Sequence, residues 1–191
     1  MVQVEIINIG DELLIGQVVN TNASQMAQKL NSHGFNVLAT SIIGDNQNQI
    51  RKSLDIALKR ADCVLITGGL GPTADDITKP TLCKFFNTDL VLNEAALENI
   101  QDIFRLRGYE MTERNRLQAY IPKSCTYIPN HYGTAPCMWF EKDNTVYISL
   151  PGVPFEMKSI FKTELIGRLK NHFKPTPYDR RVIMTTGVGE S

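Results

Sequence analysis

The feature that most constrains the fold is an alternation of short apolar runs with helix-like patterns. Apolar, strand-like runs end at Ile9, Ile43 and Thr67, and a stretch with helical spacing of apolar residues follows each of them. Successive parallel strands need a long crossover connection, and an α-helix is the usual one. The alternation therefore predicts an α/β fold, with a mostly parallel sheet covered by helices on both faces.

Apolar periodicity and capping residues predict the individual elements. We expect strands at 1–9, 37–43, 64–67, 135–141 and 145–150, the last two forming a β-hairpin. We expect helices at 23–32, 50–58, 94–107 and 154–173, with further helices beginning at Thr78 and near Thr112. Thr78 is the expected N-cap of its helix, with Pro80 in the first turn. Asp45 or Asn46 is the expected cap of the helix at 50–58.

Composition narrows the class of protein. The 191 residues carry 20 basic and 20 acidic side chains, and this balance speaks against direct nucleic-acid binding. No run of 18 apolar residues occurs, and acidic residues interrupt the amino terminus, so we expect neither a membrane span nor a signal peptide. The four cysteines lack a C-x-x-C spacing, which favours reduced thiols in a cytoplasmic protein.

The length predicts one domain and a short additional segment. We assign residues 1–174 to the domain and residues 175–191 to a linker followed by the start of another domain. A strand-like pattern begins near Arg181 and stops at Ser191, so we expect the natural chain to continue. We also expect a homo-oligomer.

The segment 67–76 reads TGGLGPTADD and follows the apolar run 63–66, which is typical of a buried strand. Three glycines within four residues let the backbone approach a ligand and turn N–H groups toward an anion. The segment is not a P-loop, because a proline follows the third glycine, and it lacks the last glycine of the dinucleotide fingerprint. Asp75 and Asp76 then occupy positions where a bound phosphate would favour positive charge.

Polar or glycine-rich turns follow four predicted strands, at 10–14, 44–46, 67–76 and 150–157. Ligands of open α/β sheets bind beyond the carboxyl ends of the strands. The acidic residues in these turns are Asp11, Glu12, Asp45, Asp75, Asp76 and Glu156. Two unit charges 4 Å apart repel by about 4 kcal/mol at an effective dielectric near 20. A hard divalent cation such as Mg²⁺, shared between carboxylates and a phosphate, would remove this repulsion. Lys79 is expected to add one positive charge to the same rim.

Structural roles are open for several of these residues. The pair 10–11 also suits an ordinary turn, and Asp45 suits a helix cap. Asp75 and Asp76 could cap the following helix, although Thr78 already suits that position. The glycines that precede Asp76 favour a functional role for it.

Four segments together carry a resemblance to a known family. GDELL at 10–14, the loop 67–76, GTAP at 133–136 and LPGVPFEM at 150–157 occur in the order seen in the competence/damage-inducible protein A (CinA) family. The glycine loop and the L-P-G-x-P turn also resemble the wider molybdopterin-binding fold of molybdenum-cofactor biosynthesis proteins. The resemblance covers about residues 1–173, and GVGES at 187–191 is similar to the opening of the family's second domain.

The resemblance implies a three-layer α/β/α domain of molybdopterin-binding-like fold with an added β-hairpin. In CinA-type proteins such a domain is associated with metal-dependent hydrolysis of ADP-ribose to AMP and ribose 5-phosphate. The expected cofactor is thus Mg²⁺ or a similar divalent ion, and the expected partner is a small nucleotide. The family's nicotinamide mononucleotide deamidase is a separate carboxy-terminal domain, so that activity is not expected of these residues.

The resemblance also implies roles for matching residues. Asp76, Glu156 and Asp11 are the expected catalytic residues, with Glu156 as the general base. The expected metal ligands are Asp76, Asp11 and Asp45. The glycine N–H groups would face a phosphate, and Thr134 would contact the ligand from the opposite loop. The expected ligand-binding residues are Gly10, Glu12, Thr67, Gly68, Gly69, Gly71, Thr73, Lys79, Thr134, Pro151 and Gly152. Pro80 departs from the family's usual acidic or small residue.

Two other functions remain open from the sequence. The first is a non-catalytic domain that binds molybdopterin or another phosphorylated pterin, because the shared loops suit either phosphorylated heterocycle. Glu156 and the segment 133–136 favour the hydrolase. The second is a scaffold in DNA uptake or damage response, which the balanced charge disfavours.

Overall fold

A six-stranded sheet forms the centre of the computed structural model, which describes residues 1–176 and Thr186. The strand order is β2-β1-β3-β8-β7-β6, and β2, β1, β3 and β8 run parallel. β7 runs antiparallel to both β8 and β6. The strands are β1 (Val2–Ile9), β2 (Phe35–Ile43), β3 (Cys63–Thr67), β6 (Thr126–Ile128), β7 (Cys137–Lys142) and β8 (Thr145–Leu150). The predicted mostly parallel sheet and its hairpin are therefore confirmed.

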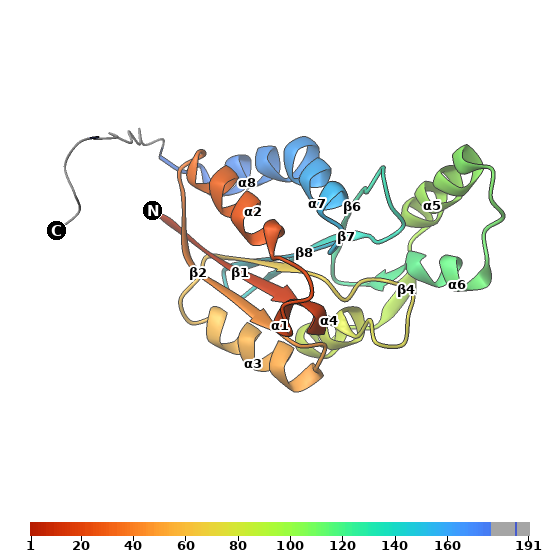
Figure 1. The fold of residues 1–191 in the computed structure, drawn as a ribbon, viewed down its shortest axis with the longest axis horizontal. Coiled ribbons are helices and arrows are strands. Elements are labelled where there is room, and N and C mark those ends of the chain that lie inside the picture. Colours follow the sequence, from red (N-terminus) through yellow and green to blue (C-terminus); the bar gives the residue numbers. More distant parts are fainter. Residues whose placement is uncertain (177–185, 187–191) are drawn as a thin grey trace.

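Helices cover both faces of this sheet (Figure 1). One face carries α2 (Thr21–Asn31), α7 (Pro154–Ile160), η2 (Phe161–Leu165) and α8 (Ile166–Phe173). The other face carries α3 (Gln47–Ala57) and α4 (Thr78–Phe86). The predicted three-layer α/β/α architecture is confirmed.

The central strands β1, β3 and β8 are mostly apolar because both of their faces are buried. Successive side chains of a strand point to opposite faces. Ile6 and Leu65 pack toward α2 and α7, whereas Ile7 and Ile66 pack toward α3 and α4. All four are buried. Two hydrophobic cores therefore sandwich the sheet, and the ends of its parallel strands are held in register beneath the loops that follow them.

The helix starts show which polar residues act as caps. Asn46 caps α3, since its side chain accepts hydrogen bonds from the N–H groups of Asn48 and Gln49. Asp45 therefore remains available for another role. The expectation that Thr78 caps α4 is wrong, because Ile77 is the N-cap residue. Thr78 is buried, and its hydroxyl donates to the Gly68 carbonyl at 3.0 Å, which ties the start of α4 to the glycine loop.

The helix expected at 154–173 is interrupted. A π-helical turn, η2, separates α7 from α8. The predicted apolar stripe along this segment is nevertheless buried, at Met157, Ile160, Phe161, Leu165 and Leu169. On both sides of this turn the stripe belongs to the core on one face of the sheet.

A small lobe beside the sheet was only partly predicted. Its helices are α5 (Glu94–Arg107) and α6 (Glu113–Arg116), and the short η1 (Leu117–Ala119) follows them. The strands β4 (Leu90–Leu92) and β5 (Tyr120–Pro122) pair antiparallel and form a second sheet that we did not predict. Figure 1 shows this lobe projecting from the side of the central sheet. A single helical turn, α1 (Asp11–Leu14), also stands where we expected a loop.

Further sequence predictions concern the cysteines, membrane-spanning helices and the carboxy-terminal segment. All four cysteines are free thiols. Within residues 1–176, no helix has the length and apolar character needed to cross a membrane. The predicted strand near Arg181 and the segment 187–191 lie outside the described residues.

Candidate functional site

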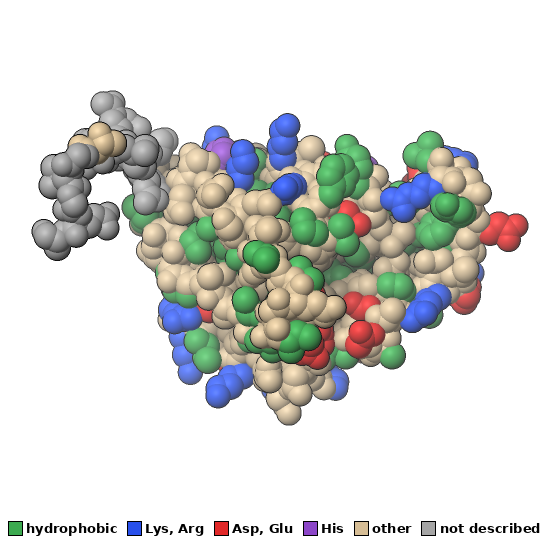
Figure 2. Space-filling view, in the orientation of Figure 1, with side chains coloured by type: hydrophobic (Ala, Val, Ile, Leu, Met, Phe, Trp, Pro, Cys, Tyr) green, Lys and Arg blue, Asp and Glu red, His purple; other side chains and the backbone are tan. Residues whose placement is uncertain are grey.

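A pocket of about 460 Å³ opens at the carboxyl edge of the parallel strands. The loops after β1, β2, β3 and β8 all reach it, as the sequence predicted. The predicted residues that line it are Gly10, Glu12, Asp45, Thr67, Gly68, Gly69, Gly71, Asp75, Asp76, Thr134, Pro151, Gly152 and Glu156. Figure 2 shows acidic side chains gathered beside a hollow on this face, with most Lys and Arg side chains at the periphery.

The glycine loop requires glycine for steric reasons. Gly68 and Gly69 have φ values of 107° and 63°, in the region that other residues avoid. A Cβ atom on Gly68 would lie 2.0 Å from the carbonyl oxygen of Ile9. The loop therefore passes directly over the end of β1, and this close approach shapes the floor of the pocket.

Two of the three glycine N–H groups are already used inside the protein. Gly68 N donates to the Leu150 carbonyl at 3.3 Å, and Gly71 N donates to Asp76 Oδ1 at 2.7 Å. This corrects the expectation that all three glycines offer N–H groups to a phosphate. Among residues 68–71, the N–H groups of Gly69 and Leu70 have no acceptor in residues 1–176. They are the donors left for an anionic ligand.

Asp76 lines the pocket and also closes the loop. Its Oδ1 accepts from Gly71 N, and its Oδ2 accepts from both the N–H and the hydroxyl of Thr73. Thr73 therefore holds Asp76 but does not itself line the pocket. Asp76 combines a structural role with a position at the site.

Asp11 and Asp45 hold each other through reciprocal hydrogen bonds. Asp11 N donates to Asp45 Oδ2 at 3.1 Å, and Asp45 N donates to Asp11 Oδ1 at 3.2 Å. Burial raises the pKa of Asp45, and the charges of Asp11, Glu12 and Asp76 raise it further, opposed in part by the hydrogen bond from Asp11 N. The carboxylate of Asp45 thus lies in a field of uncompensated negative charge.

The predicted metal ligands do not form a complete protein cage. Among residues 1–176, no group of three or more His, Cys, Asp or Glu side chains is arranged to hold a metal ion. Asp11 does not line the pocket, but it is hydrogen-bonded to Asp45, which does. A cation at this site would need ligands from elsewhere, such as a bound phosphate or water.

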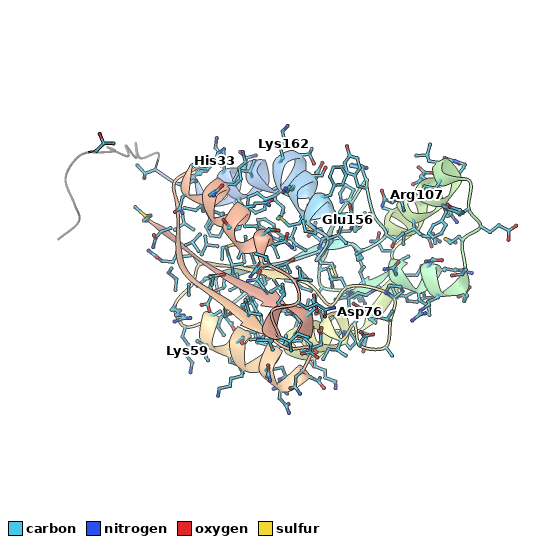
Figure 3. The ribbon with its side chains drawn as sticks, in the orientation of Figure 1. His33, Lys59, Asp76, Arg107, Glu156 and Lys162 are labelled. Atoms are coloured by element: carbon cyan, nitrogen blue, oxygen red, sulfur yellow. The ribbon has the colours of Figure 1, made fainter. Side chains whose placement is uncertain are left out.

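Glu156 lies at the start of α7, across the site from Asp76 (Figure 3). Its Oε2 accepts a hydrogen bond of 2.8 Å from Asn130 Nδ2, and Asn130 is fully buried. Gly133 packs against the same carboxylate, because a Cβ there would lie 2.2 Å from each of its oxygens. Glu156 is therefore held by a loop that the sequence analysis placed near the site only through Thr134.

Lys79 does not reach the rim, which corrects our expectation. Only 8% of its surface is exposed, and its ammonium group donates to the carbonyls of Gln118 and Tyr120. Burial lowers the pKa of Lys79 to about 8, and the charge of Asp76 opposes part of this change. Its position in the first turn of α4 directs the side chain into the lobe and away from the loop.

Residues 5–171 match the model of a family described as "Probable molybdopterin binding domain". The chain belongs to this family. The "CinA-like protein" of Cytophaga hutchinsonii is 46% identical over 187 residues, which are 98% of this chain and 45% of that protein. The "CinA-like protein" of Flavobacterium psychrophilum is 44% identical over 97% of this chain and 45% of its own length. The chain thus spans about half the length of the curated relatives it matches.

Solved structures place the domain within the CinA branch of the family. The crystal structure of the CinA protein from Thermoplasma acidophilum superposes with a TM-score of 0.75 at 36% identity, covering 84% of this chain and 94% of that one. The molybdopterin biosynthesis enzyme MoaB from Thermus thermophilus has a TM-score of 0.60 at 20% identity, over 91% and 94% of the two chains. The MoaB likeness concerns the fold alone.

The structure of this CinA-family domain adds polar residues that the sequence analysis missed. Asn8, Asn22 and Gln118 are buried and line the pocket, and each has a side-chain oxygen without a hydrogen-bond partner in residues 1–176. Asn130 is a fourth polar residue that the sequence analysis missed, and it contributes to the site through its hydrogen bond to Glu156. A signal was present for Asn8, because it is a polar residue in the apolar run that ends the strand at Ile9.

Proposed function

We propose that this CinA-family domain hydrolyses the pyrophosphate bond of a nucleoside diphosphate in the presence of a divalent cation. The substrate would be ADP-ribose, and the products AMP and ribose 5-phosphate. The observation that supports this proposal is the placement of two separate acidic groups on one pocket. Asp45 and Asp76 lie with the glycine loop, whereas Glu156 is held on its own by Asn130. One group suits charge compensation and the other suits proton transfer.

The donor set fits a magnesium ion that the substrate completes. Mg²⁺ in phosphate-handling sites commonly takes one or two protein carboxylates together with substrate phosphates and water. Asp11 and Asp45 each use one carboxylate oxygen in their mutual hydrogen bonds, which leaves a second oxygen on each. The raised pKa of Asp45 reflects negative charge that a cation would neutralise. When bound, such an ion supplies positive charge to the phosphate oxygens.

The chain's own groups would carry the remaining steps. The N–H groups of Gly69 and Leu70 would donate to a phosphate oxygen, in the manner of a backbone anion nest. Glu156 Oε2 is occupied by Asn130, so Oε1 would accept the proton of the attacking water. The water oxygen forms a new bond to one phosphorus atom while the bridging P–O bond breaks. The bridging oxygen leaves with the other phosphate.

The decisive test measures AMP release from ADP-ribose by chromatography, with and without Mg²⁺. We expect magnesium-dependent turnover in the wild-type protein and a loss of at least about 100-fold in Glu156→Gln and Asp45→Asn. Asp55→Asn is the matched control, because Asp55 is an exposed residue of α3. Turnover that needs no cation, or that survives in Glu156→Gln, would contradict the proposed roles.

A second candidate function is binding of molybdopterin or another phosphorylated pterin without hydrolysis. The observation in its favour is the match to the molybdopterin-binding family model over residues 5–171. Calorimetry with a pterin phosphate, combined with the AMP assay, separates the two functions. Tight pterin binding in a protein that releases no AMP would favour this candidate over the hydrolase.

A further inference from the structure

Two buried asparagine oxygens on one wall of the pocket have no hydrogen-bond partner. Asn8, at the end of β1, is fully buried, and Asn22, in the first turn of α2, is 8% exposed. Both residues line the pocket, and the Oδ1 atom of each is unpaired within the described part of the chain. A buried acceptor without a donor lowers stability, so such atoms call for a specific explanation.

The hydrogen bonds of the two amide groups define which atom is the acceptor. Asn8 Nδ2 donates to the Ser41 carbonyl at 2.8 Å, and Asn22 Nδ2 donates to the Gly152 carbonyl at 2.8 Å. Because a carbonyl can only accept, a flipped amide would place two oxygens against each other. The unpaired atoms are therefore oxygens, and only a hydrogen-bond donor can satisfy them.

This wall lies on the opposite face of the sheet from the aspartates. Asn8 lies between Ile7 and Ile9, which pack toward α3 and α4, so strand alternation turns it toward α2. Asn22 belongs to α2 itself, and its Nδ2 also approaches Thr67 Oγ1 at 3.5 Å. Asp45 and Asp76, by contrast, precede α3 and α4, whereas Glu156 begins α7 on the same face as α2. The pocket thus has an aspartate end and an amide end on different faces of the sheet.

The rim at the amide end is apolar. Val18, Val19 and Val153 line the pocket there and are at least half exposed, with exposed fractions of 50%, 80% and 53%. Exposed valines beside buried amide acceptors match a ligand group that has apolar faces and hydrogen-bond donors on its edge. A planar heterocycle with an amino or ring N–H group has this chemistry.

We propose that the amide end of the pocket binds the heterocycle of the ligand and selects it by its hydrogen-bond donors. Asn8 Oδ1 and Asn22 Oδ1 accept from the exocyclic amino group, and the valines cover the ring faces. Both oxygens are shielded from solvent, so the side chains that cover them must shift when the ring enters. The inference rests on the proposed function for the position of the diphosphate, and it applies to adenine and pterin rings alike.

The test compares ligands that differ at the exocyclic amino group. ADP-ribose is compared with its hypoxanthine counterpart, in which an oxo group replaces the amino group, and pterin is compared with lumazine, which differs in the same way. Calorimetry in the Glu156→Gln background with Mg²⁺ prevents turnover during the titration. We expect the amino compound of at least one pair to bind about tenfold more tightly or better, because the oxo group would face an acceptor. The pair that shows this preference identifies the source of the heterocycle.

Variants then assign the preference to the asparagines. Asn22→Leu and Asn8→Leu should each bring the ratio of the affinities for the amino and oxo compounds close to one. Asn36→Leu should leave this ratio unchanged. Asn36 is the matched control, because it pairs with Gln3 near the start of β1, at the opposite edge of the sheet. The comparison in the Glu156→Gln background alone stands even if a leucine variant fails to fold.

Several outcomes would overturn the inference. Equal affinity within both pairs would do so, as would ordered water on both oxygens in a ligand-bound crystal structure. Binding of both members of the ADP-ribose pair with equal affinity rejects this subsite but leaves the hydrolase proposal intact. If neither member of the ADP-ribose pair binds and pterin binds clearly more tightly than lumazine, the result rejects the hydrolase and supports the subsite.

Discussion

Asn130 Nδ2 donates a hydrogen bond of 2.8 Å to Glu156 Oε2, and this bond joins the loop after β6 to the start of α7. The same Nδ2 donates to the Ala135 carbonyl at 2.9 Å, while Asn130 Oδ1 accepts from Tyr132 N at 3.2 Å. One buried side chain therefore shapes the loop and aims the carboxylate. It leaves Oε1 of Glu156 for a ligand or water.

Asn130→Ala should lower both stability and turnover. The change removes three hydrogen bonds from a buried group, and we expect a loss of about 1–3 kcal/mol in the free energy of unfolding. Urea denaturation measures this loss. We also expect kcat for ADP-ribose to fall by at least about tenfold with KM nearly unchanged, because Asn130 orients Glu156 but does not touch the substrate.

Asn99→Ala is the control for this prediction. Asn99 Nδ2 donates to the Asn130 carbonyl at 2.8 Å, so its removal loosens the same loop without changing the bond to Glu156. An equal loss of kcat in both variants would show that loop stability, and not the orientation of Glu156, limits turnover.

Gly133→Ala should displace Glu156. The new Cβ would fall 2.1 Å from the Glu156 carboxyl carbon, so the side chain must move away from Asn130. We expect AMP release to drop by at least about tenfold while circular dichroism shows a folded protein. Gly167→Ala provides the contrast, since nothing lies within 4 Å of its added Cβ and it sits inside α8. That variant should gain up to about 1 kcal/mol of stability, and a matching loss of activity in it would contradict the steric explanation.

Asp45→Asn should stabilise the protein at neutral pH. The folded protein raises the pKa of Asp45, so the carboxyl group favours folding when protonated and loses this contribution as the pH rises through the raised pKa. An amide cannot ionise and avoids the repulsion from Asp11 and Glu12. The gain in the free energy of unfolding should appear near neutral pH and vanish below the ordinary carboxyl pKa. Urea denaturation at both ends of this range measures it, and a gain independent of pH would exclude the charge effect.

Lys79 should make stability rise with pH in the alkaline range. Its pKa is about 8 in the folded protein against an ordinary 10.5, so the folded state binds fewer protons between these values. The contribution of Lys79 is therefore full above about 10.5 and is lost as the pH falls through about 8. The free energy of unfolding of the wild-type protein, relative to Lys79→Met, should increase across this window. A constant difference would show that the ammonium group is not desolvated.

The sequence predicted secondary-structure elements well where residues next to each other in the chain determine the backbone conformation. The helix 94–107 was predicted with its observed bounds, because its apolar residues have helical spacing and Gly108 ends it at a φ of 69°. The hairpin was predicted from the turn that contains Asp143 and Asn144, both of which adopt positive φ values. Thr112 caps α6 as expected.

The lobe could not be predicted in the same way. β4 and β5 have three residues each, which is too short for a period of two to stand out. Their pairing joins residues about 30 positions apart, across α5 and α6. Lys79 shows the consequence, because its ammonium group bonds to carbonyls in η1 and β5, in a part of the lobe that no sequence signal placed beside it.

The order of apolar runs and glycines was sufficient by itself to specify a parallel α/β sheet and the edge at which a ligand would bind, because both depend on backbone geometry within a few residues. Only the tertiary structure decided which polar atoms remain for that ligand. Gly71 N is taken by Asp76, and Glu156 is held by Asn130 from 26 residues away, whereas the oxygens of Asn8 and Asn22 stay unpaired. Whether a polar atom is satisfied depends on groups brought from distant parts of the chain, and local sequence patterns do not contain those distances.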